Sequence, residues 1–244
     1  MKKYISLSKY PGKTGQYFYT EFFKQYNIDA VYEPRGTDNL DVSIKQAIEE
    51  GVAGISVSMP YKKEVITYLN KAAPSVSNYN SCNTINVEDG KYIGYNTDIA
   101  GVEYVSTFMN TDDQITILGT GAIGRMVIRY LESNRFGKMN ICARSLGSWH
   151  RRKECSDVII NCTSLGTATI DSPFDVLPTN TRLVIDLAIN NNNLKFQCAT
   201  AGIKYVSGEE FYQAQFTQQF EIYTGIKVDT QLYNEIKNKQ YETV

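Results

Sequence analysis

The sequence predicts an α/β protein of two domains, and three observations lead to that fold class. Short apolar, β-branched runs alternate with amphipathic stretches along most of the chain. Near the middle, the glycine-rich turn "GTGAIG" joins one such run to a helix. The 244 residues suffice for one large or two modest domains with their own cores. We therefore assign residues 1–100 with 212–244 to the first domain and residues 101–211 to the second.

The first domain begins with strands and helices in turn. Runs of β-branched and aromatic residues predict strands over "YISLS", "AVYEPR" and "GISVSMP", the last ending at Pro60. Apolar residues at helical spacing predict helices over "TGQYFYTEFFKQYN" and "NLDVSIKQAIEEGV". Four aromatic residues of the first helix share that spacing, which favours a place in the core over a binding surface: Tyr17, Phe18, Phe22 and Phe23.

The second domain is predicted to be a parallel sheet with helices on both faces, the doubly wound arrangement of a Rossmann-type domain. A helix from about Ile99 to Met109 leads into "QITILGTGAIGRMVIRYLESN", which is a strand, a turn and a helix. Four further strands are predicted over "KMNICAR", "DVIINCTS", "LVIDLA" and "IKYVSG". Only residues 145–156 separate Arg144 from the strand "DVIIN", so we expect one edge strand to be missing on the adenine side. Two final helices, over 209–225 and 229–240, are expected to return to the first domain.

Composition and charge argue against several classes of protein. A formal net charge of −1 gives no basic field for nucleic acid or anionic lipid. No apolar run approaches the roughly 20 residues of a membrane-spanning helix, and the N-terminus lacks the apolar stretch of a signal peptide. The single histidine, His150, argues against a histidine triad or a metal cluster. The five cysteines form no C-x-x-C pair, which indicates reduced thiols and no structural zinc: Cys82, Cys142, Cys155, Cys162 and Cys198.

The cysteine usage predicts a cytoplasmic protein. We expect no metal, no nucleic acid and no membrane partner, and the sequence leaves a homodimer open.

The turn "GTGAIG" is a full G-x-G-x-x-G between a strand and a helix, which is the context that a dinucleotide site requires. Gly119 permits the tight turn, Gly121 lets the pyrophosphate approach the backbone, and Gly124 lets helix and strand pack closely. Ala122 and Ile123 open the helix, whose positive end faces the pyrophosphate.

The end of the next strand favours NADP over NAD. An NAD site usually carries an acidic residue there for the ribose hydroxyls, whereas this chain has Arg144 and Ser145 in "CARS". An arginine would bind a 2′-phosphate with charge-assisted hydrogen bonds and stack on adenine. Two roles are open for the nearby run Arg151–Lys153. It could add positive charge to this site, or it could be a solvated cluster on the surface. Thr163, after the strand "DVIIN", completes the predicted cofactor contacts.

Six motifs in order resemble the shikimate dehydrogenase family: "SVSMPYKKEV", "SCNTIN", "GYNTDIAG", "GTGAIG", "NCTSLG" and "FYQAQFTQQFEIYTG". The resemblance runs through most of the chain. It implies an N-terminal substrate domain, an NADP-binding Rossmann domain and a cleft between them. It also implies reversible hydride transfer between NADP(H) and a ring alcohol or ketone, as for shikimate and 3-dehydroshikimate in aromatic amino acid biosynthesis.

The resemblance also implies the site residues. Lys62 matches the family's catalytic lysine, and Asp98, which closes "YNTD", matches its aspartate partner. A carbonyl that accepts hydride needs a proton donor close by, and a Lys–Asp pair suits that chemistry. Lys63 is the neighbouring alternative, although the register after Pro60 favours Lys62. Asn83 and Gln213 match family residues that hydrogen-bond substrate hydroxyls.

The chain departs from the family at the end that binds the substrate carboxylate. The family's Ser-x-Ser falls on Lys13 and Gly15, its tyrosine on Ile189, and a methionine on Thr167. The stretch "YPGKTG" is no phosphate-binding P-loop, because the position of that motif's first glycine is a leucine. Two readings stay open: Lys13 and Thr14 hold a carboxylate in a new way, or the substrate is a cyclic polyol, aminocyclitol or modified shikimate that lacks it.

Two other functions remain as alternatives. A folate-type methylene dehydrogenase shares the two-domain plan and a catalytic lysine. A catalytically inactive dinucleotide-binding sensor would explain the lost serines and the shortened adenine side.

Overall fold

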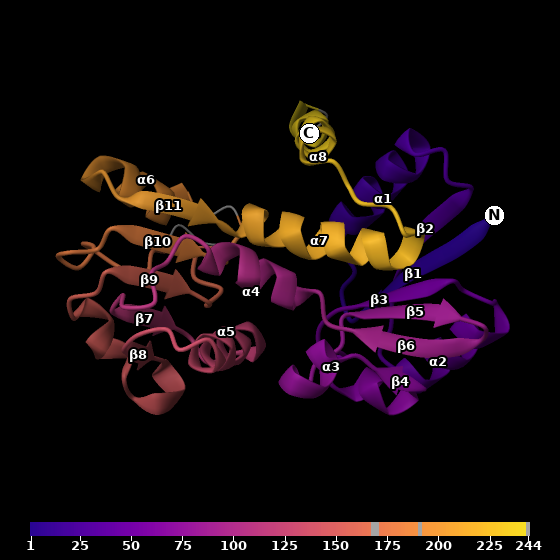
Figure 1. Ribbon diagram of the computed structural model, residues 1–244, viewed down its shortest axis with the longest axis horizontal. Coiled ribbons are helices and arrows are strands. Elements are labelled where there is room, and N and C mark those ends of the chain that lie inside the picture. The colour runs from indigo at the N-terminus through magenta and orange to yellow at the C-terminus, as the bar shows by residue number, and fades with distance from the viewer. Residues whose placement is uncertain (167–170, 190–191, 243–244) are drawn as a thin grey trace. The chain divides into compact units, whose positions relative to one another are not determined.

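The computed structural model describes residues 1–166, 171–189 and 192–242. The chain forms two compact units (Figure 1): unit 1 comprises Met1–Thr97 with Phe216–Val244, and unit 2 comprises Asp98–Gln215. These boundaries differ slightly from those drawn from the sequence, so that Asp98 and Gln213 belong to unit 2. Each unit contains its own sheet.

Within the described residues, unit 1 is built on a mixed six-stranded sheet with the strand order β2-β1-β3-β5-β6-β4. Strand β1 is parallel to β2 and β3, whereas β5 is antiparallel to β3 and to β6. The strands are β1 Lys2–Ser8, β2 Ala30–Gly36, β3 Gly54–Val57, β4 Lys71–Ala72, β5 Thr84–Glu88 and β6 Lys91–Tyr95.

The hairpin β5–β6 was not predicted as structure, although its turn has a clear signal. Asp89 and Gly90 both have positive φ, 49° and 73°, as a two-residue type I′ turn requires. Glu88 and Lys91 pair on either side of the turn. Because the hairpin runs between two of the motifs, it brings Asn83, just before β5, and Thr97, just after β6, to the same end of the sheet.

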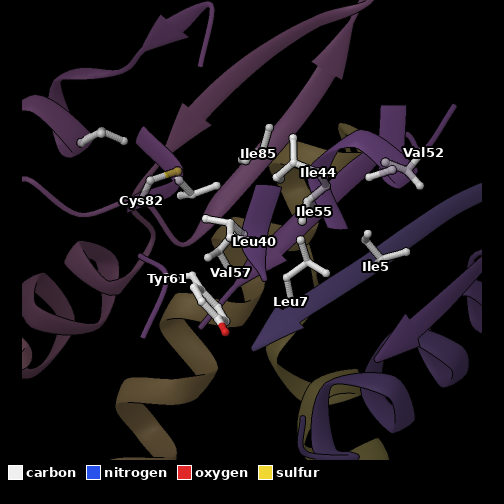
Figure 2. Packing of buried hydrophobic residues seen from close by; sticks show 13 residues of the cluster. Ile5, Leu7, Leu40, Ile44, Val52, Ile55, Val57, Tyr61, Cys82 and Ile85 are labelled. Atoms are coloured by element: carbon white, nitrogen blue, oxygen red, sulfur yellow. The ribbon is translucent and has the colours of Figure 1, made fainter. Parts of the chain in front are cut away.

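Helix α2 covers one face of the sheet in unit 1 and forms the apolar core shown in Figure 2. Asn39 caps this helix, because its side chain accepts a hydrogen bond from the Val42 N–H. The cluster joins α2 to β1, β3 and β5 and consists of Ile5, Leu7, Leu40, Ile44, Ala47, Val52, Ile55, Val57, Tyr61, Val65, Val76, Cys82 and Ile85. The helices of unit 1 are α1 Thr14–Gln25, α2 Leu40–Glu49, the 3-10 helix η1 Glu64–Tyr68, α3 Pro74–Tyr79 and α8 Thr230–Glu242.

Aromatic side chains form a second core in unit 1. Tyr4 follows the pleat of β1 to the opposite face from Ile5, and its hydroxyl donates to the Tyr223 carbonyl at 2.9 Å. Phe18 stacks on Tyr233 of α8, with ring centroids 5.0 Å apart. The helical stripe predicted to be core is buried at Phe18, Phe22 and Phe23, whereas Tyr17 is half-buried. The final helices thus pack on α1 through aromatic contacts.

In the described residues, unit 2 contains a five-stranded parallel sheet with the order β11-β10-β9-β7-β8. The first strand of this sheet in the sequence is β7; β8 pairs on one side of it and β9 on the other. The strand order therefore reverses at β7, and the carboxyl end of β7 is a topological switch point. The strands are β7 Ile115–Leu118, β8 Met139–Cys142, β9 Val158–Asn161, β10 Leu183–Asp186 and β11 Lys204–Ser207. The α-helices are α4 Asp98–Ser106, α5 Ala122–Ser133, α6 Asn192–Ala201 and the first part of α7 Gly208–Thr224, which belongs to unit 1 from Phe216 on. The predicted α/β class is confirmed in both units.

Strand β8 lies at the edge of this sheet, as the short connection after it predicts. In place of a helix and a further strand, two 3-10 helices, η2 Arg144–Leu146 and η3 Trp149–Lys153, lead to β9. Between them, the Ser148 hydroxyl donates to the Ile141 carbonyl at 2.9 Å and accepts from the Ala143 N–H at 3.1 Å. One side chain therefore satisfies two backbone groups at the open edge of β8.

The described residues lack two further features. None of the helices there combines the length and the apolar character that a membrane crossing needs. The same residues contain no group of three His, Cys, Asp or Glu side chains placed to hold a metal ion.

Candidate active site

The turn between β7 and α5 has the backbone geometry that a bound pyrophosphate needs. Gly119 has a φ of +93°, a conformation that favours glycine. A side chain at Gly124 would overlap the Gly119 carbonyl oxygen, so its absence lets α5 start close to β7. Nothing lies within 4 Å of where a Cβ of Gly121 would be, which leaves this backbone open to a ligand. Ala122 and Ile123 form the first turn of α5, where N–H groups lack a helical carbonyl partner.

A pocket of about 530 Å³ lies beside this turn, at the carboxyl ends of β7, β8 and β9. It brings together five residues predicted from the sequence: Gly119, Gly121, Arg144, Ser145 and Thr163. Ala122, Ile123 and Gly124 do not line it. The remaining lining residues were not predicted: Thr120, Arg125, Ala143, Trp149, Ser164 and Leu165.

Hydrogen bonds fix the polar side chains of this pocket. The hydroxyls of Thr120 and Ser145 lie 3.2 Å apart and join the first two loops. The N–H and hydroxyl of Thr163 both donate to the Asn161 side-chain oxygen, at 3.1 and 2.7 Å. Asn161 in turn donates to the fully buried carboxylate of Asp186 at 2.8 Å. The third loop is thereby anchored to β10.

Two arginines of the pocket have no carboxylate partner among the described residues. Arg144 and Arg125 form no ion pair within residues 1–166, 171–189 and 192–242, and Arg125 donates to the Thr120 carbonyl at 2.6 Å. An unneutralised guanidinium beside a helix N-terminus is suited to bind phosphate. The cluster Arg151–Lys153 is different. Its three side chains do not line the pocket.

Each side chain of that cluster has another partner. Arg151 forms an ion pair with Glu154 at 3.2 Å, and Lys153 lies 3.8 Å from Asp175. Arg152 donates to the carbonyls of Pro173 and Trp149 at 2.7 and 3.0 Å. Of the two readings drawn from the sequence, the structure favours the surface cluster. The pocket itself fits a dinucleotide: the backbone at the glycine turn is open to a pyrophosphate, and Arg144 and Ser145 offer hydrogen-bond donors to a phosphate.

In unit 1, Asn83 is buried, with 4% of its surface exposed, and lies in a network of hydrogen bonds. Its side-chain oxygen accepts from the Thr84 hydroxyl and the Thr97 N–H, each at 2.8 Å, and its amide donates to the Thr97 hydroxyl at 3.0 Å. The oxygen is therefore held toward the protein, so Asn83 can act on a ligand only as a donor, through its Nδ2.

Gln219 of α7 lies behind Asn83 and was not predicted. It is 5% exposed and donates to the Thr84 hydroxyl at 2.6 Å and the Asn83 carbonyl at 3.3 Å. Its own oxygen accepts from the Tyr19 hydroxyl at 2.9 Å and the Ser56 hydroxyl at 3.1 Å. Gln219 thus links α1, β3, β5 and α7, and it orients the hydroxyl that orients Asn83.

Gln219→Leu is expected to lower the free energy of unfolding by about 2–4 kcal/mol, because the hydroxyls of Tyr19, Ser56 and Thr84 each lose a hydrogen bond. Urea unfolding measures the change. Gln218→Leu is the matched control, since Gln218 is the exposed neighbour on the same helix and should change stability by less than about 0.5 kcal/mol. Equal losses in both variants would contradict the role given to Gln219.

Lys62 lies between β3 and η1, half-buried, and the adjacent Lys63 is exposed. The Lys62 carbonyl accepts from the Cys82 N–H at 2.7 Å, which ties its loop to the residue before Asn83. Asp98 is the first residue of α4 and is only 7% exposed; it follows Thr97, which Asn83 holds. A carboxylate in the first turn is stabilised by the helix dipole. The pairing of the Lys62 and Asp98 side chains stays a prediction.

Two cysteines that precede predicted site residues in the sequence, Cys82 before Asn83 and Cys162 before Thr163, are protonated thiols at neutral pH. Burial raises the pKa of Cys82 to about 11. Burial first, and then the carboxylate of Asp186, raise the pKa of Cys162 to about 12. Neither thiol is suited to act as a nucleophile or a general base near pH 7.

The other described residues inferred from the resemblance are exposed or half-buried. Lys13 and Thr14 are exposed at the start of α1, and Lys13 caps the helix without a side-chain hydrogen bond. Gln213 is half-buried on α7, in unit 2. Ile189 is 42% exposed. Thr167 lies outside the described residues. The roles of Lys13, Thr14 and Gln213 stay predictions.

The comparisons with known proteins agree with these features. Residues 14–85 match the model of the shikimate dehydrogenase substrate binding domain. The chain is 28% identical over 236 residues to the Shikimate dehydrogenase (NADP(+)) of Thermoplasma acidophilum, covering 88% of this chain and 87% of that protein. It is 24% identical over 253 residues to a Shikimate dehydrogenase-like protein of Haemophilus influenzae, covering 95% and 93%.

A solved structure shows the same fold. The shikimate 5-dehydrogenase of Thermus thermophilus, determined in complex with NADP(H) and shikimate, superposes with a TM-score of 0.82 at 18% identity and covers 98% of this chain and 99% of that one. The domain match, the similarity along nearly the whole length and the motifs in their order make this chain similar to the shikimate dehydrogenases.

Proposed function

We propose that this protein is an NADP-dependent oxidoreductase that transfers hydride reversibly between NADP(H) and a ring alcohol or ketone of the shikimate type. One observation carries the proposal: the glycine turn opens into a pocket in which Arg144 and Arg125 have no carboxylate partner among the described residues. The curated relative that is named for NADP(+) and is similar along most of the chain supports the same cofactor.

Lys62 and Asn83 of unit 1 and Asp98 of unit 2 have the chemistry that the proton transfer of this reaction needs. NADPH supplies the hydride when bound. The Lys62 ammonium donates a proton to the carbonyl oxygen as it gains negative charge, and in the reverse direction the amine takes that proton back. Asp98 accepts a hydrogen bond from the substrate hydroxyl or from the ammonium and orients the proton. Asn83 donates from Nδ2 to a neighbouring ring hydroxyl, because its oxygen is held by Thr84 and Thr97.

The substrate is proposed to carry the ring hydroxyls of shikimate, with a carboxylate end that is recognised differently or is absent. Lys13 and Thr14 stand where the family has its serine pair, so a point charge replaces two hydroxyl donors. At Gly15 a Cβ would lie 3.6 Å from the Tyr32 hydroxyl, an ordinary contact, so sterics did not force the loss of the second serine.

A substrate panel tests the proposal. Purified protein is incubated with NADP and shikimate, quinate or cyclitols, and the absorbance of the reduced nicotinamide is followed. Turnover of at least one ring alcohol is expected. Binding of NADP without turnover of any member would contradict the proposal and favour a sensor.

Lys13→Ala separates the two readings of the carboxylate end. If Lys13 binds a carboxylate, the variant should raise KM for shikimate about tenfold and leave KM for neutral cyclitols unchanged, since one charged hydrogen bond is lost. Lys24→Ala, on the same helix but at its far end, is the control. An unchanged KM for every substrate would assign no binding role to Lys13.

A further inference from the structure

Trp149 lines the pocket although nothing in the glycine motif requires a tryptophan there. It opens η3, the short helix that stands in for the missing edge strand and its helix. Its ring is half-buried and packs against the apolar core of unit 2, which includes Leu118 and Cys142. The indole is therefore held by the core while part of it faces the ligand space.

Arg152 fixes the indole from outside the pocket. Its guanidinium lies 4.9 Å from the ring centroid of Trp149. The same guanidinium group is anchored by two backbone carbonyls, those of Pro173 at 2.7 Å and Trp149 at 3.0 Å. A ring with one anchored cation and an apolar core beside it has little freedom to move.

Arg144 is the second cation near this ring, with its guanidinium carbon 5.6 Å from the centroid. That distance is within the range of about 6 Å for a cation–π contact. In the part of the chain that the structure describes, Arg144 has no carboxylate partner. Other arginines of the protein are held by acids: Arg35 by Glu50 and Glu33, and Arg182 by Asp113.

Whether an arginine is held by a carboxylate or by an aromatic ring decides how well it can bind an anion. A carboxylate would hold Arg144 in place but would neutralise it and compete with an incoming phosphate. The face of an indole restrains the guanidinium while leaving its charge and its N–H donors available to a ligand. A restrained donor also loses less conformational entropy when the ligand binds.

We propose that Trp149 is a positioning residue that holds Arg144 for the 2′-phosphate of an adenosine 2′-phosphate ligand, and that this pair sets the preference for NADP over NAD. The inference rests on the proposed function, because it takes the pocket to be the adenine end of the cofactor site. It also explains how a sheet that lacks an edge strand keeps a defined site there.

The test compares two ligands that differ by the phosphate, 2′,5′-ADP and 5′-AMP, by calorimetric titration of the full chain. Trp149→Leu keeps an apolar side chain but removes the π face, and Trp149→Phe keeps a π face. Trp149→Leu is expected to raise the Kd for 2′,5′-ADP about three- to fivefold and to leave that for 5′-AMP unchanged. Trp149→Phe should retain most of the wild-type preference. Arg144→Leu removes the guanidinium itself and therefore sets the largest expected effect, a rise of about 10- to 100-fold in the Kd for 2′,5′-ADP.

Several outcomes would overturn the inference. If Trp149→Leu weakens both ligands equally, the indole stacks on adenine and does not position Arg144. If the Leu and Phe variants raise the Kd for 2′,5′-ADP equally, Trp149 serves only the packing of the unit. Thermal unfolding would then show a lower melting temperature for both variants. His150→Ala, at the exposed neighbouring position, is the control and should change neither Kd.

The same measurements distinguish a failure of the proposed function from a failure of the role given to Trp149. A wild-type protein that binds neither 2′,5′-ADP nor NADP would remove both the cofactor assignment and the inference. A wild-type preference for 2′,5′-ADP that Trp149→Leu does not alter would leave the cofactor assignment intact and remove only the role of Trp149. A second route is Arg152→Gln, which loosens the indole without changing the pocket lining and should shift the preference in the same direction.

Discussion

Lys62→Ala is expected to lower kcat by a factor of about 10²–10⁴ and to leave the Kd for NADP unchanged. The variant removes the ammonium that protonates the substrate oxygen, while the cofactor pocket lies in unit 2 and consists of other residues. Single-turnover kinetics with NADPH and the best ketone of the substrate panel measure the chemical step, and titration of NADPH measures the Kd.

Lys63→Ala is the matched control for this experiment. Lys63 is adjacent, carries the same charge and is exposed, whereas Lys62 is half-buried with its carbonyl bonded to the Cys82 N–H. The control should retain wild-type kcat. Equal losses in the two variants would point to a general effect of charge, and a greater loss in Lys63→Ala would shift the catalytic assignment by one residue.

Gly121→Ala is expected to raise the Kd for NADP about 10- to 100-fold without changing the melting temperature. No protein atom lies within 4 Å of the new methyl group, so the fold accommodates it. Gly121 lines the pocket just before α5, so the methyl group stands between the pyrophosphate and the N–H groups of that helix. Isothermal titration and thermal unfolding of the same preparation give the two values.

Gly12→Ala serves as the control for an added methyl group. Gly12 also has nothing within 4 Å of its Cβ position, and it lies in unit 1, whereas the glycine turn belongs to unit 2. This variant should keep the wild-type Kd for NADP. A drop in melting temperature for Gly121→Ala alone would mean that the glycine serves the fold and not the ligand.

Local patterns in the sequence were sufficient to predict most of the fold. The aromatic residues of α1 and the β-branched runs of unit 2 bury the faces that their spacing predicts, because helical and strand periods fix which side chains share a face. The short connection after Arg144 was enough to predict that β8 is an edge strand. The hairpin β5–β6 was not predicted, although Asp89-Gly90 between its strands is a strong turn signal.

The residues of the candidate site could be predicted only where they lie in or next to a local sequence motif. The glycine turn, Arg144 and Ser145 lie within or next to the motif, and the structure brings them to one pocket. Gln219 could not be predicted, because a glutamine on a helix gains its role from partners 135–200 residues away in the sequence. Trp149 and Arg152 depend in the same way on how the shortened connection folds against the sheet.

Ser148 shows how the sheet of unit 2 is protected at its open side. An edge strand with unpaired N–H and C=O groups is a template for another chain, and proteins that lose a strand are exposed to edge-to-edge aggregation. Here a single hydroxyl supplies one donor and one acceptor, the two functions that a neighbouring backbone would have provided. These two backbone groups of β8 are therefore not available to pair with the strand of another chain.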